Sequence, residues 1–167
     1  MLLGERPGFS PQIGVLVDMM HYARLTTLEA VEGLSLEELD AIPDGFSNSI
    51  GMLLAHIAAT DRLYQRLSFN DDGFNEAEWD QYGGAFSMGR EGNRVRGCSL
   101  EILLDDLEAV RSKTLDEFAL RDDTWLYSRL KAPRCEDMNQ HWAWFHVMED
   151  ELSHRGQIRI LRKALKS

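Results

Sequence analysis

FHVMEDELSHRGQ, residues 145–157, is the segment from which the architecture of this chain is best inferred. Its pattern is typical of an α-helix, and within it His146, Asp150 and His154 are spaced four residues apart. Residues at that spacing share one face of a helix. Because imidazole and carboxylate groups are common ligands of divalent transition metals, the segment predicts a helix that presents metal-binding side chains.

A second helical segment carries one more histidine. SIGMLLAHIA, residues 49–58, places His56 inside an otherwise apolar run. Two helices that each point such groups inward can build a metal site in the core of a bundle. His56 would then complete a three-ligand site with two residues of the segment 145–157.

The three candidates on segment 145–157 cannot all face one ion equally well. Each step of four residues rotates the side chain by about 40° around the helix axis. The natural pair is therefore either Asp150 with His154 or His146 with Asp150. An alternative without metal is equally open, in which Asp150 and His154 form an ion pair within the helix and His56 is a hydrogen-bonded histidine of the core.

Helical periodicity and helix-capping residues account for most of the remaining chain. No alternating run of β-branched residues is long enough to predict a strand. We expect a single domain over residues 1–167, all-α and built as a four-helix bundle. The first predicted helix runs from Pro11 to about Gly33, and a short helical turn follows with the capping box Ser35–Glu38. The second begins at Ser47 or Asn48 and has its last apolar position at Leu67; the third begins at Ser99 and has its last apolar position at Leu115. A connection from Asp122 to Pro133 precedes the fourth, which runs from Asn139 to about Leu165.

A long segment, residues 70–99, separates the second and third predicted helices. It is rich in Gly, Asp and Asn, yet it also contains Phe74, Trp79, Tyr82 and Phe86. So many aromatic residues are not typical of a disordered linker. We expect a long ordered crossover that packs these aromatic side chains over one end of the bundle, and loops of this length are often functional.

The composition argues against several classes of partner. The chain of 167 residues is 44% hydrophobic and carries a formal net charge of −10 at pH 7. Nucleic acid and anionic membrane surfaces repel a polyanion, so neither is expected as a partner. Charged residues and histidines interrupt the apolar runs too early for a bilayer span, and the beginning of the sequence has no signal-peptide pattern. We therefore expect a cytoplasmic protein.

Two cysteines and two tryptophans bear on assembly. Cys98 and Cys135 are expected to be free thiols, because disulfides are rare in the cytoplasm and neither residue belongs to a CxxC motif. We expect a homodimer built on exposed aromatic residues such as Trp79 and Trp144.

The two histidine-bearing segments together resemble the DinB-like superfamily. SIGMLLAHIA at 49–58 pairs with WFHVMEDELSHRGQI at 144–158, and the chain looks like the branch long labelled a domain of unknown function, close to mycothiol-transferase-like proteins. MGREG at 88–92, RGCSL at 96–100 and RDDTWL at 121–126 also resemble that branch. The likeness extends over nearly the whole chain.

The resemblance implies a four-helix bundle with one divalent metal ion, zinc or nickel. Carried over by position, the ligands are His56, Asp150 and His154. Many relatives have histidine where this chain has Asp150, and a carboxylate there suits manganese or iron as well as zinc. His146, two turns before His154, is then expected to orient a ligand or to shuttle a proton.

The expected function is that of a divalent-metal-dependent enzyme acting on a small-molecule substrate. Three protein ligands leave positions open on the ion for water or substrate. The resemblance favours a thiol-dependent S-transferase with a low-molecular-weight thiol as cosubstrate, either mycothiol, bacillithiol or glutathione. Two alternatives remain: a metal-dependent hydrolase, in which the ion activates water, and a non-catalytic metal-binding or structural dimerisation module.

Overall fold

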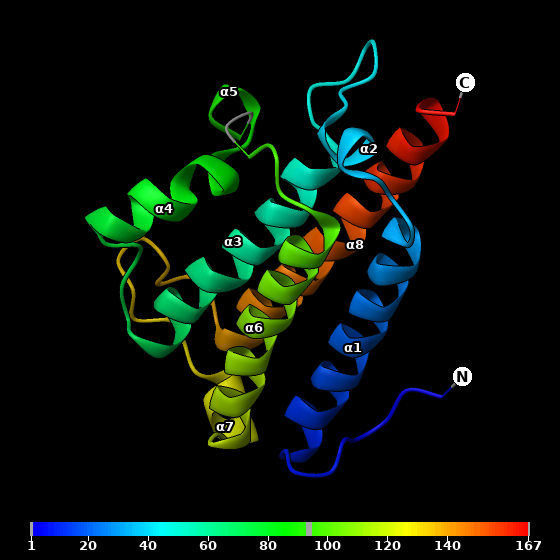
Figure 1. Ribbon diagram of the computed structural model, residues 1–167. Coiled ribbons are helices and arrows are strands. Elements are labelled where there is room, and N and C mark those ends of the chain that lie inside the picture. Colours follow the sequence, from blue (N-terminus) through cyan, green and yellow to red (C-terminus); the bar gives the residue numbers. More distant parts are fainter. Residues whose placement is uncertain (1, 93–94, 167) are drawn as a thin grey trace.

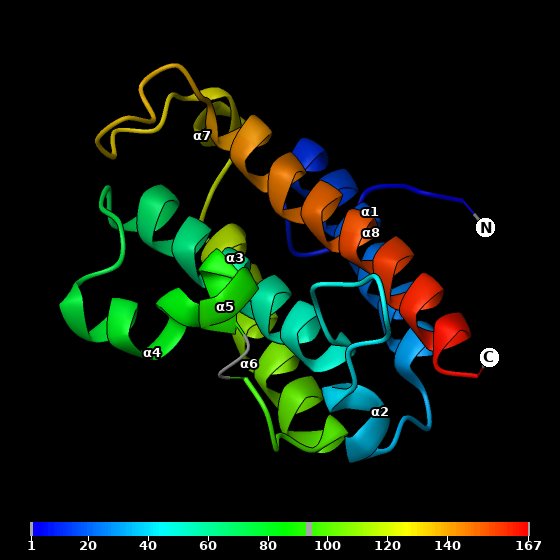
Figure 2. The same cartoon turned by 90° about the horizontal axis from the view of Figure 1, so that it is seen from above.

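Four long helices pack side by side and form the body of the molecule (Figure 1). They are α1 (Pro11–Val31), α3 (Ile50–Phe69), α6 (Leu100–Ala119) and α8 (Gln140–Ala164). The structure is a computed structural model that describes residues 2–92 and 95–166. Helix α8 packs against α1 and α3, and α3 also packs against α6; Figure 2 shows this arrangement from above. The predicted all-α four-helix bundle is confirmed.

The helix starts follow the capping residues, with one correction. Ser99 and Asn139 cap α6 and α8 as predicted. Helix α3 is capped by Ser49 and not by Ser47 or Asn48, because the Ser49 side chain accepts the backbone N–H of Met52. Helix α6 ends at Ala119, before the connection that was predicted to begin at Asp122. No helix among the described residues has both the length and the apolar character of a membrane span.

Short helices occupy the predicted connections. The capping box at Ser35 and Glu38 opens α2 (Leu36–Asp40), as predicted. The connection after α6, for which no helix was predicted, contains α7 (Asp123–Tyr127).

The crossover between α3 and α6 is ordered but is arranged differently from the prediction. It forms α4 (Glu76–Ser87) and α5 (Gly89–Gly92), and its residues 93 and 94 lie outside the described part of the chain. Helix α4 packs along the side of α3, so its aromatic residues do not cover one end of the bundle (Figure 1).

The apolar core is divided into two clusters along the bundle. One cluster joins the end of α1, the first halves of α3 and α6, and the last turns of α8. The other joins most of α1 with the later parts of α3 and α6 and the start of α8. On each of the four long helices, one buried charged residue lies between the stretch that contributes to one cluster and the stretch that contributes to the other. These residues are Arg24, Asp61, Arg111 and Glu151. We call these four residues the ionic belt.

The ionic belt connects all four long helices. Arg24 Nε donates to Glu151 Oε1 at 2.8 Å, and Arg111 Nη2 donates to Glu151 Oε2 at 3.0 Å. Arg111 Nε donates to Asp61 Oδ2 at 2.8 Å, and Thr114 Oγ1 donates to Asp61 Oδ1 at 2.6 Å. Burial alone would raise the pKa of Glu151, but the charges and hydrogen bonds of Arg24 and Arg111 outweigh burial and lower it. The belt therefore holds two positive and two negative charges.

Trp144 corrects the predicted dimer surface. Its side chain is fully buried, its Nε1 donates to Ser68 Oγ at 2.8 Å, and its ring packs against Phe69 and Phe118. Trp144 is therefore not an exposed aromatic residue on which a dimer can form. Trp79 is 47% exposed, as expected. Cys98 and Cys135 are both free thiols.

Candidate metal site

Helices α3 and α8 lie antiparallel and present side chains to each other in a constant register. In the first half of α3, the ring centroids of His56 and His154 are 4.7 Å apart. About two turns further along α3, the ring centroids of Tyr64 and His146 are 5.7 Å apart. Two positions eight residues apart on α3 therefore meet two positions eight residues apart on α8.

Three side chains converge at this interface. Asp150 Oδ1 is 3.2 Å from His154 Nε2, and Asp150 Oδ2 is 3.6 Å from His56 Nε2. One ligand atom from each residue lies within 4.8 Å of those of the other two. Metal–ligand bonds of about 2.0–2.1 Å at tetrahedral angles separate ligand atoms by about 3.3 Å, which is close to the 3.2 and 3.6 Å between Asp150 and the two histidines. We call His56, Asp150 and His154 the triad, and it can bind a divalent metal ion.

In both histidines of the triad, Nδ1 contacts an oxygen on the side away from Asp150, and Nε2 faces Asp150. His56 Nδ1 lies 3.1 Å from the carbonyl oxygen of Ala85, which can only accept a hydrogen bond. In the neutral ring Nδ1 therefore carries the proton and Nε2 keeps its lone pair. His154 Nδ1 lies 3.3 Å from Gln157 Oε1, which favours the same tautomer. Metal-binding histidines commonly donate their second N–H to an oxygen in this way.

Asp150 leaves one buried oxygen without a hydrogen bond. Its Oδ2 atom is buried and has no hydrogen-bond partner among the described residues. An unsatisfied buried carboxylate oxygen is costly, and native proteins rarely leave one. A cation between Asp150 and the two histidines would satisfy this oxygen, so the residues present fit a bound divalent ion.

The electrostatic environment of the triad favours a cation. Burial alone would lower the pKa of His56, but Asp150 and the carbonyls of Ala85 and Phe86 outweigh burial and raise it. Burial would raise the pKa of Asp150, yet the neighbouring imidazoles of His154 and His56 hold this pKa well below the usual carboxyl range. Asp150 is therefore ionised at neutral pH. The negative charge that favours a proton on His56 favours a metal cation in the same place.

Helix α4 covers the histidine of α3. His56 Nδ1 donates a hydrogen bond to the Ala85 carbonyl of this helix, and the ring of Phe86 stacks on His56 with 5.9 Å between centroids. Phe86 in turn packs edge-on against Phe74 and Trp79. A cavity of about 550 Å³ lies between α3, α4 and α6, and the residues that line it include no member of the triad. The crossover thus shields the His56 side of the triad from water.

The structure brings three of the four sequence candidates together and leaves the fourth apart. His146 lies one turn before Asp150, and its Nδ1 is 3.3 Å from Glu149 Oε2. Its ring stacks on Trp142 with 5.1 Å between centroids. Of the two pairs that the spacing left open, Asp150 with His154 is the pair that faces His56. A role of His146 in orienting a ligand or shuttling a proton stays a prediction.

Three contributors to the site were not identified from the sequence. Thr60 Oγ1 lies 3.3 Å from His56 Nε2, Gln157 contacts His154, and Ala85 contributes its carbonyl. Helical spacing could have indicated Thr60 and Gln157, because they follow the two histidines by four and three residues. The carbonyl of Ala85 is 29 residues from His56, and no side-chain pattern indicates it.

Leucine in place of Gln157 is expected to weaken metal binding without removing a ligand. Leucine has a similar size but cannot accept the His154 Nδ1 proton, so the imidazole is no longer held in the metal-binding tautomer. Loss of such an outer partner typically lowers metal affinity about 10–100-fold. Competition with a chelator on the metal-loaded protein measures the change.

The matched control for Gln157→Leu is Glu149→Gln, which alters a contact of His146 on the same helix. This variant should bind metal as tightly as the wild-type protein. Equal affinities of Gln157→Leu and wild-type protein would contradict the assigned role of Gln157.

Comparisons with known proteins bear on the family and the fold. The family whose model matches this chain is described as mycothiol-S-transferase, and the match covers residues 15–167. No match was found among curated proteins. Among solved structures, a conserved protein from Enterococcus faecalis is similar, with a TM-score of 0.70 and 15% sequence identity over 90% of this chain and 94% of that chain. At this identity the likeness concerns the fold alone.

Proposed function

The chain belongs to the mycothiol-S-transferase family, a DinB-like branch, and from this premise we propose that it is a divalent-metal-dependent thiol S-transferase. Its cosubstrate is a low-molecular-weight thiol, with mycothiol, bacillithiol and glutathione as the candidates. Its second substrate is a small electrophile. The observation that carries the proposal is the triad of two buried histidines and a partly buried aspartate, in which one carboxylate oxygen has no hydrogen-bond partner among the described residues.

The triad would hold the ion through His56 Nε2, His154 Nε2 and the Asp150 carboxylate. This donor set suits zinc or nickel, and its carboxylate also suits manganese or iron. When bound, such an ion lowers the pKa of a thiol and so supplies a thiolate nucleophile at neutral pH.

Residues around the triad prepare it for this chemistry. Ala85 and Gln157 hold the two imidazoles with their lone pairs inward, so little reorganisation is needed when the ion binds. Three protein ligands leave coordination positions for a thiol. Phe86 keeps water from one side of His56, which strengthens charge interactions at the site.

Two other functions would use the same residues. A metal-dependent hydrolase would activate water in place of a thiol. A non-catalytic module would bind the ion for stability or assembly alone, and a homodimer that uses the exposed Trp79 belongs to this alternative. We prefer the transferase because the description of the matching family, mycothiol-S-transferase, names this activity.

Conjugation assays on untagged, metal-loaded protein test the proposal. Each of the three thiols is combined with a panel of electrophiles, and the loss of free thiol is followed with metal-loaded and metal-free protein. At least one combination should react faster with the metal-loaded protein. Metal-dependent hydrolysis of esters or amides without conjugation would favour the hydrolase. Metal binding with neither activity would favour the non-catalytic module.

A further inference from the structure

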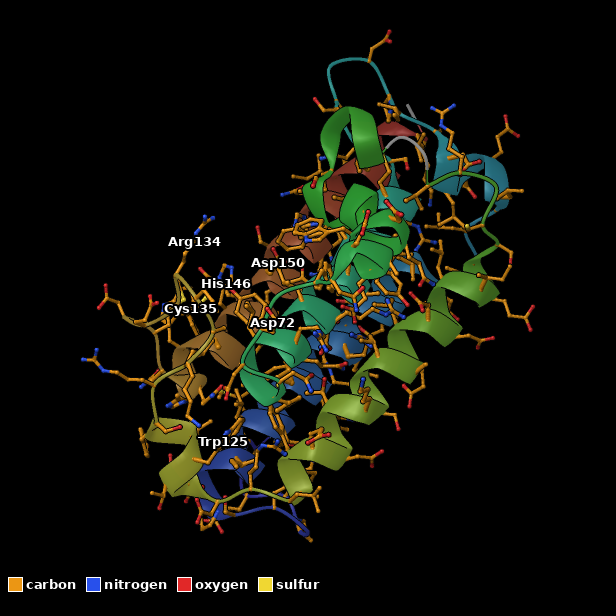
Figure 3. The ribbon with its side chains drawn as sticks, turned by 90° about the vertical axis from the view of Figure 1, so that its left-hand side faces the viewer. Asp72, Trp125, Arg134, Cys135, His146 and Asp150 are labelled. Carbon is orange, nitrogen blue, oxygen red and sulfur yellow. The ribbon has the colours of Figure 1, made fainter. Side chains whose placement is uncertain are left out.

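Tyr64 lies beside the triad on α3, about two turns after His56. Its side chain is buried, with 9% of its surface exposed, and its ring lies 5.7 Å from that of His146. Because α3 and α8 keep a constant register, Tyr64 and His146 are the facing pair one turn beyond Asp150. Figure 3 shows His146 and Asp150 along α8, with Cys135 on the loop that precedes this helix.

The Tyr64 hydroxyl has no hydrogen-bond acceptor among the described residues. Its oxygen is also not one of the fully buried unpaired atoms, although the residue as a whole is only 9% exposed. A buried tyrosine usually finds a partner for its hydroxyl. Tyr64 is therefore a donor that lacks a protein acceptor at the edge of the triad.

Two polar neighbours of Tyr64 make other contacts. His146 has its Nδ1 3.3 Å from Glu149 and its ring stacked on Trp142. Thr60, one turn before Tyr64, has its hydroxyl 3.3 Å from His56 Nε2. A ligand beside the triad can therefore supply the acceptor that these residues do not.

The surroundings also keep the hydroxyl protonated. Burial, with the nearby acidic groups of Cys135 and Asp150, raises the pKa of Tyr64 to about 12. Because this pKa lies far above neutral pH, the phenol stays un-ionised at pH 7 and can donate a hydrogen bond. Such a neutral, positioned donor can stabilise negative charge that develops on an oxygen atom during a reaction.

Building on the proposed function, we propose that the Tyr64 hydroxyl binds the carbonyl oxygen of the electrophilic substrate, and that this substrate is an α,β-unsaturated carbonyl compound. Addition of a thiolate to such a compound moves negative charge onto the carbonyl oxygen, where a neutral donor is effective. An alkyl halide without oxygen develops no such charge, so Tyr64 has no role in its conversion.

The addition balances without a further reactant. The thiolate sulfur forms a bond to the β-carbon with its electron pair, and the C=C π-bond breaks. That π-pair gives an enolate, whose oxygen accepts the hydrogen bond from Tyr64. The α-carbon then takes one proton from water, which offsets the proton that the thiol released. Tyr64 keeps its own proton throughout.

Tyr64→Phe tests this proposal in the metal-loaded full chain, with Tyr82→Phe as the matched control. Tyr82 lies on α4 with its ring under Arg62 and makes no contact with the triad. With the most active thiol, Tyr64→Phe should lower kcat/KM for 2-cyclohexenone about 100-fold, as loss of one oxyanion donor does. The value for benzyl chloride should stay within about twofold, because this electrophile has no oxygen. Metal content should match the wild-type protein.

A binding measurement tests Tyr64 independently of turnover. Cyclohexanone has the same carbonyl but cannot react, and its Kd, followed by ligand-observed NMR, should rise about fivefold in Tyr64→Phe, as loss of one neutral hydrogen bond implies. Tyr82→Phe should bind it as the wild-type protein does.

The outcomes separate this proposal from the proposed function. Equal losses for 2-cyclohexenone and benzyl chloride, or no loss for either, would overturn the role of Tyr64. Absence of cyclohexanone binding to the wild-type protein, or unchanged binding to Tyr64→Phe, would overturn it too. If no thiol is conjugated but cyclohexanone binding depends on Tyr64, the transferase proposal fails and the carbonyl-binding role of Tyr64 stands.

Discussion

Alanine in place of His56 or His154 is expected to remove stoichiometric metal binding. The untagged wild-type protein should bind about one zinc, nickel, manganese or iron ion per chain, because the triad offers a single set of ligands. Each variant should bind metal more than about 100-fold more weakly, since loss of even an outer partner costs about 10–100-fold. Elemental analysis and competition with a chelator measure the two quantities.

The physical reason lies in the geometry of the triad. Without either imidazole, Asp150 and one histidine remain, and two protein ligands do not enclose an ion. Asp150→Asn should also weaken binding, because it removes the negative charge that favours a cation between the histidines.

His141→Ala is the matched control for the histidine variants. His141 also lies on α8, but its ring contacts Tyr127 and is not part of the triad. This variant should keep full metal content. Chelation should abolish any conjugating activity of the wild-type protein, and added metal should restore it. A stoichiometric ion that survives both His56→Ala and His154→Ala would sink the site assignment.

Replacement of Glu151 by alanine is expected to cost about 3–5 kcal/mol of unfolding free energy. Glu151 is completely buried and accepts hydrogen bonds from both Arg24 and Arg111. Without it, Arg24 has no carboxylate partner among the described residues, while Arg111 keeps Asp61. One buried positive charge is then uncompensated, which is the costly case for a buried ion pair.

Urea unfolding of the metal-free protein measures this cost without interference from metal binding. Asp106→Ala is the control, because Asp106 pairs with Arg62 through a bond of 2.9 Å at the partly exposed surface. Such pairs contribute about 0–1 kcal/mol. A loss for Glu151→Ala no larger than for Asp106→Ala would show that the ionic belt does not stabilise the bundle.

Local sequence signals predicted the helices well where capping chemistry was unambiguous. Ser99 and Asn139 each stand alone before a periodic run, and each caps its helix as predicted. At the start of α3, three consecutive residues can all act as caps, so sequence preference could not select Ser49. Helix α4 has its own capping box at Asn75 and Glu78, a local signal that the high Gly and Asp content of the crossover obscured.

Exposure of the aromatic residues of α8 was less predictable. Trp142 and Phe145 are 42% and 45% exposed, whereas Trp144 between them is fully buried. Adjacent residues of a helix differ by about 100° in direction, so a run of aromatics does not itself identify the buried one. The bond from Trp144 to Ser68 requires α3 to lie beside it.

The sequence by itself determined an all-α bundle with four candidate ligands. It did so through local properties: the four-residue spacing on α8, the apolar run around His56 and the helix caps. Only the tertiary structure decided that Asp150 with His154, and not His146 with Asp150, faces His56. The reason is the rotation of α8 about its own axis, which depends on what neighbouring helices bury, including Glu151 in the ionic belt and Trp144 in the core. The same packing brings the Ala85 carbonyl to His56 from a distant segment, which no local pattern encodes.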